Sequence, residues 1–314
     1  MNSAVCTVFE GHYHYGVGVL ANSLYAQGFR GVIYAGCRGT LPPWTAGAPV
    51  KDGFTEYSPA EGLTLRFIPL TTKIHLTNYK PDFMLSLWEK HCPQAQSLFY
   101  FDPDITVIGR WPFYEDWVQG GVALCADLNP AMPPNHPLRN AWKQFYQPHG
   151  ITFRREPELY FNGGFVGVAR QHIEFLRCWQ KLQELMTPEI GGLQNVNIRE
   201  RTYLFHKTDQ DALNVAAMAS ESPISPMGQD GMDLQYGGGG FVMSHAVGGQ
   251  KPWRKQFLKS VCLRGEAPSR ADRYFFRHVE SPIRLYGSTP LSLKRLSIMT
   301  ASFVGRFVRR GGVA

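Results

Sequence analysis

Two carboxylates stand one residue apart at the end of an apolar run, in the segment Tyr100-Phe101-Asp102-Pro103-Asp104-Ile105. The apolar residues before them predict a short buried strand, so Asp102 and Asp104 fall at its carboxyl end, where ligands bind in open α/β sheets. Both carboxylates can reach one hard cation, and Mg²⁺ or Mn²⁺ prefers oxygen ligands and commonly leaves positions open for substrate phosphates. A solvated turn is the alternative, because aspartate is also favoured in turns.

A second segment with chemically capable residues lies far downstream, at Ser244-His245-Ala246-Val247-Gly248-Gly249-Gln250-Lys251-Pro252-Trp253. An imidazole ligand from His245 would favour Mn²⁺ over Mg²⁺, because imidazole suits softer metals. The two segments together predict a divalent-metal site that holds a sugar nucleotide.

Composition describes a globular chain with a full core, since 44% of the 314 residues are hydrophobic and 18% are charged. The six cysteines are scattered without a Cys-x-x-Cys pair, which argues against a zinc ribbon or a dense disulfide framework and favours reduced thiols in the cytoplasm. The first predicted strand begins almost at Met1, which leaves no room for a signal peptide. No run of eighteen apolar residues predicts a transmembrane helix.

Charge is distributed unevenly along the chain. Residues 1–250 hold 18 Lys and Arg against 22 Asp and Glu, whereas residues 251–314 hold 14 against 3. The tail predicts an amphipathic helix from Pro290, with an apolar stripe and basic residues at Leu296, Met299, Phe303, Phe307, Lys294, Arg295, Arg306, Arg309 and Arg310. Such a helix suggests binding to an anionic membrane surface, or simply packing on the core with solvated arginines. Nucleic-acid binding is disfavoured, because no recognition motif accompanies the basic tail.

Strand and helix patterns alternate over the first 130 residues and predict a mostly parallel sheet covered by helices. The predicted strands are Ala4–Phe9, Gly31–Ala35, Thr64–Pro69, Ser97–Phe101, Gly121–Ala126 and Tyr160–Ala169. The predicted helices are Val17–Gln27, Pro81–Lys90, Gln171–Met186 and Asp209–Met218, and Thr187–Gln194 is expected to be a loop.

Four motifs occur in one order along the chain: Asp102-Pro103-Asp104; Tyr160-Phe161-Asn162-Gly163-Gly164-Phe165; Thr208-Asp209-Gln210-Asp211-Ala212-Leu213-Asn214; and His245-x-x-Gly248-x-x-Lys251-Pro252-Trp253. In this the chain resembles the retaining family 8 glycosyltransferases, the group of glycogenin and of bacterial lipopolysaccharide galactosyl- and glucosyltransferases. The resemblance covers about residues 4–255. It implies a GT-A fold, a nucleotide-binding α/β sandwich over residues 1–260, followed by a basic helical extension at 261–314.

The resemblance implies a role for each motif residue. Asp102, Asp104 and His245 would hold Mn²⁺, with Mg²⁺ as the alternative, and Ile105 would lie beside the nucleotide. Gly248 and Lys251 would bind the phosphates, because a compact ammonium and a side-chain-free amide suit that role.

Further positions match residues that would face the donor sugar. These positions are Asp127, Asn162, Gly163 and Lys80. As alternatives, Asp127 could be a turn residue, Asn162 could only satisfy backbone groups, and Lys80 could be solvated.

The helix start at Asp209 carries the residues closest to the chemistry. Asp209 would bind donor hydroxyls, unless it only caps the helix. Gln210 would lie on the face of the anomeric carbon opposite the leaving group, and an amide is a poor nucleophile, which favours front-face substitution over a covalent intermediate. Asp211 is the fallback nucleophile.

Near the N-terminus, Val8, Glu10, His12 and Tyr13 stand where the family clasps the nucleotide base. The usual Asp and Asn are replaced here by Glu10 and His12, so either uracil or guanine could be bound, or the aromatic residues could simply cover the loop.

We therefore expect a cytoplasmic, peripheral membrane transferase. It would move glucose or galactose from a UDP-sugar to a glycan or glycolipid acceptor with retention. An inverting GT-A transferase and a non-catalytic sugar-nucleotide-binding scaffold are the alternatives.

Overall fold

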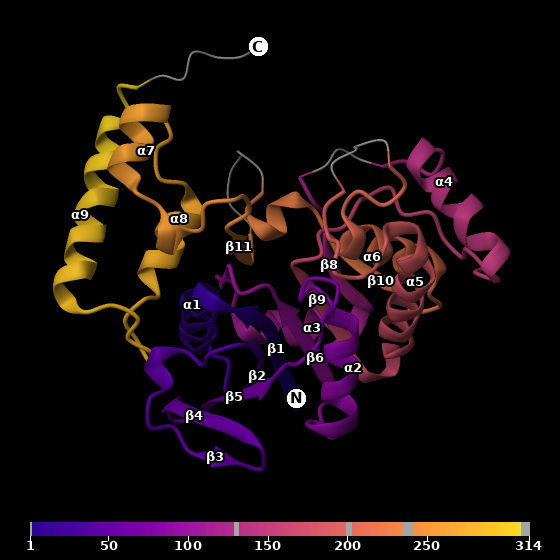
Figure 1. Cartoon of the computed structure of the whole chain (residues 1–314), viewed down its shortest axis with the longest axis horizontal. Helices are drawn as coiled ribbons and strands as arrows, with labels where there is room; N and C mark the ends of the chain where they lie inside the picture. The colour runs from indigo at the N-terminus through magenta and orange to yellow at the C-terminus, as the bar shows by residue number, and fades with distance from the viewer. Residues whose placement is uncertain (1, 129–131, 199–202, 235–240, 309–314) are drawn as a thin grey trace.

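The computed structural model describes residues 2–128, 132–198, 203–234 and 241–308 of the chain. Its centre is one large sheet with helices on both faces, and three C-terminal helices form a separate layer beside it (Figure 1). The predicted α/β architecture with a mostly parallel sheet is thus confirmed.

Nine strands form the central sheet in the order β10-β8-β9-β6-β1-β2-β5-β4-β3. Their bounds are β1 Ser3–Glu10, β2 Gly31–Arg38, β3 Val50–Lys51, β4 Phe54–Ala60, β5 Leu63–Pro69, β6 Ser97–Phe101, β8 Val122–Cys125, β9 Phe165–Ala169 and β10 Ile224–Met227. Seven of these strands point in the same direction, and β4 and β9 run against their neighbours. The carboxyl ends of β1, β2 and β6 therefore meet at one edge of the sheet.

Both faces of the central strands of the sheet are buried, as expected for parallel strands. Along β6, Leu98 and Tyr100 belong to one core cluster, whereas Phe99 and Phe101 belong to the other. The covering helices are α1 His14–Ala26, α2 Lys80–Lys90, α3 Trp111–Trp117, α4 Pro137–Tyr146, α5 Glu174–Ile190 and α6 Thr208–Ala219. Continuous apolar strands thus follow from burial on two sides.

The bounds of two predicted elements differ most from the structure. The strand expected at Tyr160–Ala169 begins only at Phe165, because the amides of Gly163 and Gly164 bond the side chains of Gln210 and Asn162 instead of a neighbouring strand. The loop expected from Thr187 begins only after Ile190, because Pro188 is accommodated within α5. That helix ends where Gly191 adopts a left-handed conformation.

The C-terminal layer consists of α7 Phe257–Arg264, α8 Arg270–Arg277 and α9 Ser288–Val304, which share a core that includes Val19 of α1. Asn22, also on α1, bonds the backbone of His278 and Ile283 at 2.7–2.8 Å. The expected domain boundary at residue 260 stays a prediction and falls inside α7.

The predicted apolar stripe of the tail does not face this core. Leu296, Met299, Phe303 and Phe307 are all exposed, while Leu291, Ile298 and Ala301 make the buried face. Arg309 and Arg310 lie outside the described residues. In the described part of the chain, no helix has the length and apolar character needed to cross a membrane.

Candidate functional site

The turn after β6 places the two aspartates at the edge of the sheet. Its amides are satisfied locally, since Asp102 N donates to Gly164 O at 2.7 Å and Ile105 N donates to Asp102 O at 3.0 Å. The first turn of α1 packs closely on it: a Cβ at Gly16 would lie 1.9 Å from the Pro103 oxygen. A residue without a side chain is therefore required where α1 meets the turn.

A small two-stranded sheet brings His245 to the aspartates. Strand β7, Ile105–Val107, pairs antiparallel with β11, Met243–His245, and its register sets His245 opposite Ile105. Ile105 itself is buried and does not line the cavity described below. Ile105 is thus the strand partner of His245, and its contact with the nucleotide stays a prediction.

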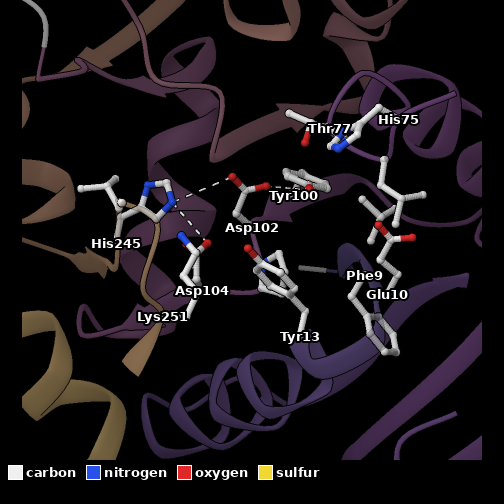
Figure 2. Close-up of a pocket in the computed structure, with 15 residues that line it drawn as sticks. Phe9, Glu10, Tyr13, His75, Thr77, Tyr100, Asp102, Asp104, His245 and Lys251 are labelled. Carbon is white, nitrogen blue, oxygen red and sulfur yellow. Dashed lines mark hydrogen bonds and ion pairs between the residues drawn. The ribbon is translucent and has the colours of Figure 1, made fainter. Parts of the chain in front are cut away.

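Asp102, Asp104 and His245 form a group whose ligand atoms all lie within 4.8 Å of one another. Nε2 of His245 lies 3.3 Å from Oδ1 of Asp104 and 3.9 Å from Oδ2 of Asp102 (Figure 2). Two carboxylates and an imidazole facing one point are a suitable donor set for Mn²⁺, and also for other divalent transition metals. The residues predicted from sequence to share a metal site are therefore brought together.

Lys251 also reaches this group. Its ammonium lies 2.5 Å from Oδ2 of Asp104 and donates to the Ala246 oxygen at 2.9 Å. Burial alone would raise the pKa of Asp104, but His245 and Lys251 hold that pKa well below its usual range. The ammonium thus stands next to the three candidate metal ligands.

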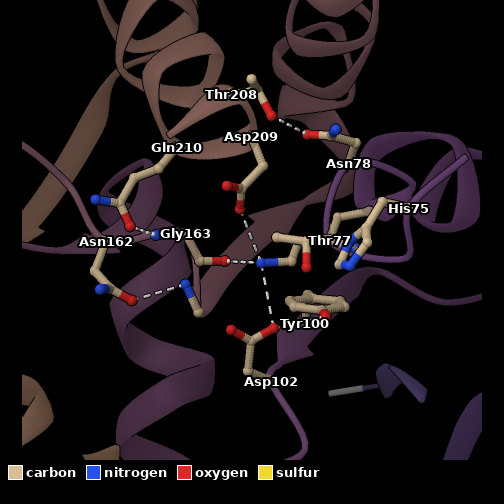
Figure 3. A network of polar contacts seen from close by, with 12 residues as sticks. His75, Thr77, Asn78, Tyr100, Asp102, Asn162, Gly163, Thr208, Asp209 and Gln210 are labelled. Atoms are coloured by element: carbon tan, nitrogen blue, oxygen red, sulfur yellow. Dashed lines mark hydrogen bonds and ion pairs between the residues drawn. The ribbon is translucent and has the colours of Figure 1, made fainter. Parts of the chain in front are cut away.

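Behind the metal group, Lys80 is buried and links separate parts of the site. Its ammonium lies 3.2 Å from Oδ1 of Asp102 and 3.2 Å from Oδ2 of Asp209, and donates to the Gly163 oxygen at 2.8 Å. Figure 3 shows Asp102, Gly163 and Asp209 arranged around the nitrogen atom of this ammonium group. Burial would lower the pKa of Lys80, but the two carboxylates raise it, so the charge is retained. This residue is therefore not a solvated lysine.

The residues expected to face the donor sugar form one connected network. Asp127 accepts from Asn162 Nδ2 at 2.6 Å and from Gln210 Nε2 at 2.9 Å, while the Gln210 oxygen accepts from Gly163 N at 3.0 Å. Both ends of the Gln210 amide are thus held, and its orientation is fixed. Lys207, which sequence reasoning missed, lies with its ammonium 3.2 Å from Oδ2 of Asp127. Its position directly before the Thr208-Asp209-Gln210 motif could have identified Lys207 as a residue of the site.

Asp211 is held differently from its neighbours. It accepts from the Tyr160 hydroxyl at 2.6 Å and from Lys207 N at 2.8 Å. Burial raises the pKa of Asp211 to about 7. These contacts fix the start of α6 against the Tyr160 segment, and Lys207 links Asp211 to the Asp127 network, because its ammonium also contacts Asp127.

A cavity of about 380 Å³ opens beside the metal group. The predicted residues that line it are Val8, Glu10, Tyr13, Asp102, Asp104, His245, Gly248 and Lys251 (Figure 2). Sequence reasoning missed other lining residues, including His75, Thr77, Tyr100 and Val247, because the segment at 75–77 carries no regular pattern.

Two expectations for base binding are altered by neighbours. Arg38 donates to Glu10 at 2.8 Å and lowers the pKa of that carboxyl, so Glu10 is a charged acceptor with one side already occupied. His12 does not line the cavity, because it accepts from the indole of Trp253 at 2.9 Å and stacks on Tyr13.

Comparisons with known proteins identify the fold. No family model and no curated protein matches the chain. Solved structures that are similar include the galactosyltransferase LgtC in complex with donor and acceptor sugar analogs, at 16% identity, TM-score 0.51, 91% of this chain and 98% of that one. The bifunctional glycosyltransferase WbbM, as an apo structure, matches at 13% identity, TM-score 0.51, 92% of this chain and 51% of that one. The glycosyltransferase GlyE of Streptococcus pneumoniae TIGR4 matches at 14% identity, TM-score 0.50, 99% of this chain and 65% of that one.

These likenesses confirm the predicted GT-A fold, and they confirm the resemblance to family 8 glycosyltransferases at the level of the fold.

Proposed function

We propose that the protein is a retaining, metal-dependent glycosyltransferase of the family 8 type that moves glucose or galactose from a UDP-sugar to a glycan or glycolipid. The observation that supports this most is the contact of Lys80 with both Asp102 and Asp209. One buried ammonium thereby joins a group fit for a metal to the network fit for a sugar.

In this proposal Asp102, Asp104 and His245 hold Mn²⁺. When bound, the metal supplies a Lewis acid that stabilises negative charge on the departing UDP. Lys251, beside Asp104, and the backbone at Gly248 bind the diphosphate next to the metal. Tyr13 and Glu10, which line the same cavity, are placed to contact the base.

The donor sugar would lie over Asp127, Asn162 and Asp209, whose polar atoms suit hydroxyl groups. Gln210 would present its fixed amide to the anomeric carbon. Because an amide is a poor nucleophile, we expect front-face substitution, in which the leaving phosphate oxygen takes the acceptor proton while Gln210 stabilises positive charge on the sugar.

A membrane location is part of the proposal, at the cytoplasmic face. Its support is the outward position of the apolar side chains of α9 in the most basic part of the sequence. A lipid-linked acceptor would then be reached at the surface of an anionic membrane.

A screen of UDP- and GDP-sugars for Mn²⁺-dependent release of nucleotide tests the proposal. We expect release from UDP-glucose or UDP-galactose, loss of release in EDTA, and an α-anomeric product by NMR. Asp104→Asn and His245→Ala should weaken Mn²⁺ binding, measured by electron paramagnetic resonance, at least tenfold. Asp116→Asn, an exposed carboxylate on α3, is the matched control. Unchanged release in EDTA would refute the metal assignment, and a β-anomer would refute retention.

A further inference from the structure

A second cavity, of about 480 Å³, lies between α7 and the loop that carries Lys251. It is lined by Gly249, Gln250, Arg254, Gln256, Lys259, Ser260 and Arg264. Three of these residues are cations and none is acidic. Gly248 and Lys251 of the same loop line the metal cavity instead, so the two cavities lie on different sides of one short segment.

The positive charge of this second cavity is only partly balanced. Lys259 forms no ion pair with any residue in the described ranges. Arg264 pairs with Glu266 at 3.0 Å, but both side chains are more than 40% exposed, and such pairs contribute little. Arg254 contacts a ring nitrogen of His12 at 3.1 Å, and an unprotonated imidazole brings no negative charge to balance the guanidinium. The Ser260 hydroxyl and the Gln250 amide oxygen accept from the Arg264 guanidinium at 2.8 Å and 3.3 Å and hold it at the cavity, so the cavity suits a phosphate.

Exposed apolar side chains lie on α7 and on the helix packed beside it. Leu263 is 72% exposed and lies one helical turn after Lys259 on the same face of α7. Helix α9 runs alongside α7 (Figure 1), with Phe303 and Phe307 also exposed. Exposed apolar groups next to unbalanced cations are typical of surfaces that bind anionic lipid.

We propose that this cavity binds the phosphate group of an anionic lipid. The exposed apolar side chains of α7 and α9 then enter the interfacial region of the same bilayer surface. A lipid fits better than a free nucleotide, because a nucleotide would leave this apolar surface exposed. The inference rests on the membrane part of the proposed function and is independent of sugar transfer.

Vesicle co-sedimentation of the full chain tests this assignment, with phosphatidylcholine vesicles that contain or lack phosphatidylglycerol. The test variant is Lys259→Gln with Arg264→Gln. The matched control is Lys90→Gln with Lys181→Gln, which removes the same charge from exposed positions on α2 and α5. We expect the wild-type protein and the control to bind the anionic vesicles and the test variant to bind about 30-fold more weakly. The charge-conserving variant Lys259→Arg with Arg264→Lys should bind the anionic vesicles as the wild-type protein does.

Calorimetric titration with inorganic phosphate separates the two sources of the ligand. Millimolar or weaker phosphate binding together with tight vesicle binding supports the lipid. Tight phosphate binding without vesicle binding would overturn the lipid assignment.

Two further outcomes would also overturn the proposal: equal vesicle binding by wild-type protein and test variant, or an equal loss in the control pair. Nucleotide release from the UDP-sugar, measured on the same variants, should stay unchanged. A loss of release with normal vesicle binding would instead concern the proposed sugar transfer.

Discussion

The ammonium of Lys80 lies 3.2 Å from Oδ2 of Asp209 although both side chains are buried. The same ammonium contacts Asp102, so a carboxylate of the candidate metal group and a carboxylate at the start of α6 share one partner. Burial raises the pKa of Asp209, and Lys80 opposes that rise. Lys80 and Asp209 therefore each favour the charged form of the other.

Replacing Lys80 with Met should destabilise the fold by about 3 kcal/mol at pH 7, because removal of one partner leaves a buried carboxylate unpaired. The free energy of unfolding in urea, followed by circular dichroism, measures the effect. Asp209→Asn should lower the free energy of unfolding much less in the Lys80→Met background than in the wild-type protein. Equal costs in the two backgrounds would show that Lys80 and Asp209 are not coupled.

Gly164 approaches the metal group closely enough to make its substitution informative. An added Cβ would lie 2.5 Å from Cε1 of His245 and 2.8 Å from Oδ1 of Asn162. Strand β11 fixes the backbone of His245, so the methyl group added in Gly164→Ala should displace the imidazole ring. Mn²⁺ binding should then weaken at least tenfold. Gly287→Ala, whose added methyl group would meet only ordinary contact, should leave Mn²⁺ affinity unchanged. Full affinity in Gly164→Ala would contradict the close packing.

Gln210 should affect turnover more than substrate binding. Its amide bonds Asp127 and Gly163, and in the proposed mechanism it stabilises charge that develops only in the transition state. Removing such a group costs roughly 100- to 1,000-fold in kcat. We expect Gln210→Ala to show that loss in steady-state assays with little change in KM, while the exposed Gln171→Ala keeps wild-type kcat. A loss below threefold would remove Gln210 from the chemical step.

Asp211 should make stability fall as pH rises. Burial raises the pKa of this carboxyl to about 7 in the folded protein, from a usual value near 3.8. Its folded pKa lies above its unfolded pKa, so its unfavourable contribution is absent below about pH 4, grows between pH 4 and pH 7, and then stays constant.

In Asp211→Asn this contribution is missing. The unfolding free energy of the variant minus that of the wild-type protein should therefore rise by roughly 4 kcal/mol from pH 4 to pH 8. Urea titrations at each pH measure this difference. A difference that stays constant over the range would show that Asp211 ionises normally in the fold.

The sequence by itself determined which side chains could form the candidate site. Asp102, Asp104 and His245 were identified by residue type and motif order, and the apolar strand before Asp102 predicted its place at a sheet edge. Residue type also determined the parallel sheet, because strands buried on both faces must be apolar throughout. These features are local, and local patterns are what a sequence displays directly.

Only the tertiary structure decided how these groups are connected. Lys80 was as consistent with solvent as with the site, until burial against Asp102 and Asp209 excluded solvent. Arg38 became the partner of Glu10 through the β1–β2 register. The apolar stripe of α9 could have faced either way, because a helix pattern shows that one face is apolar but not which surface covers it. Contacts between distant segments, set by packing, resolved each of these alternatives.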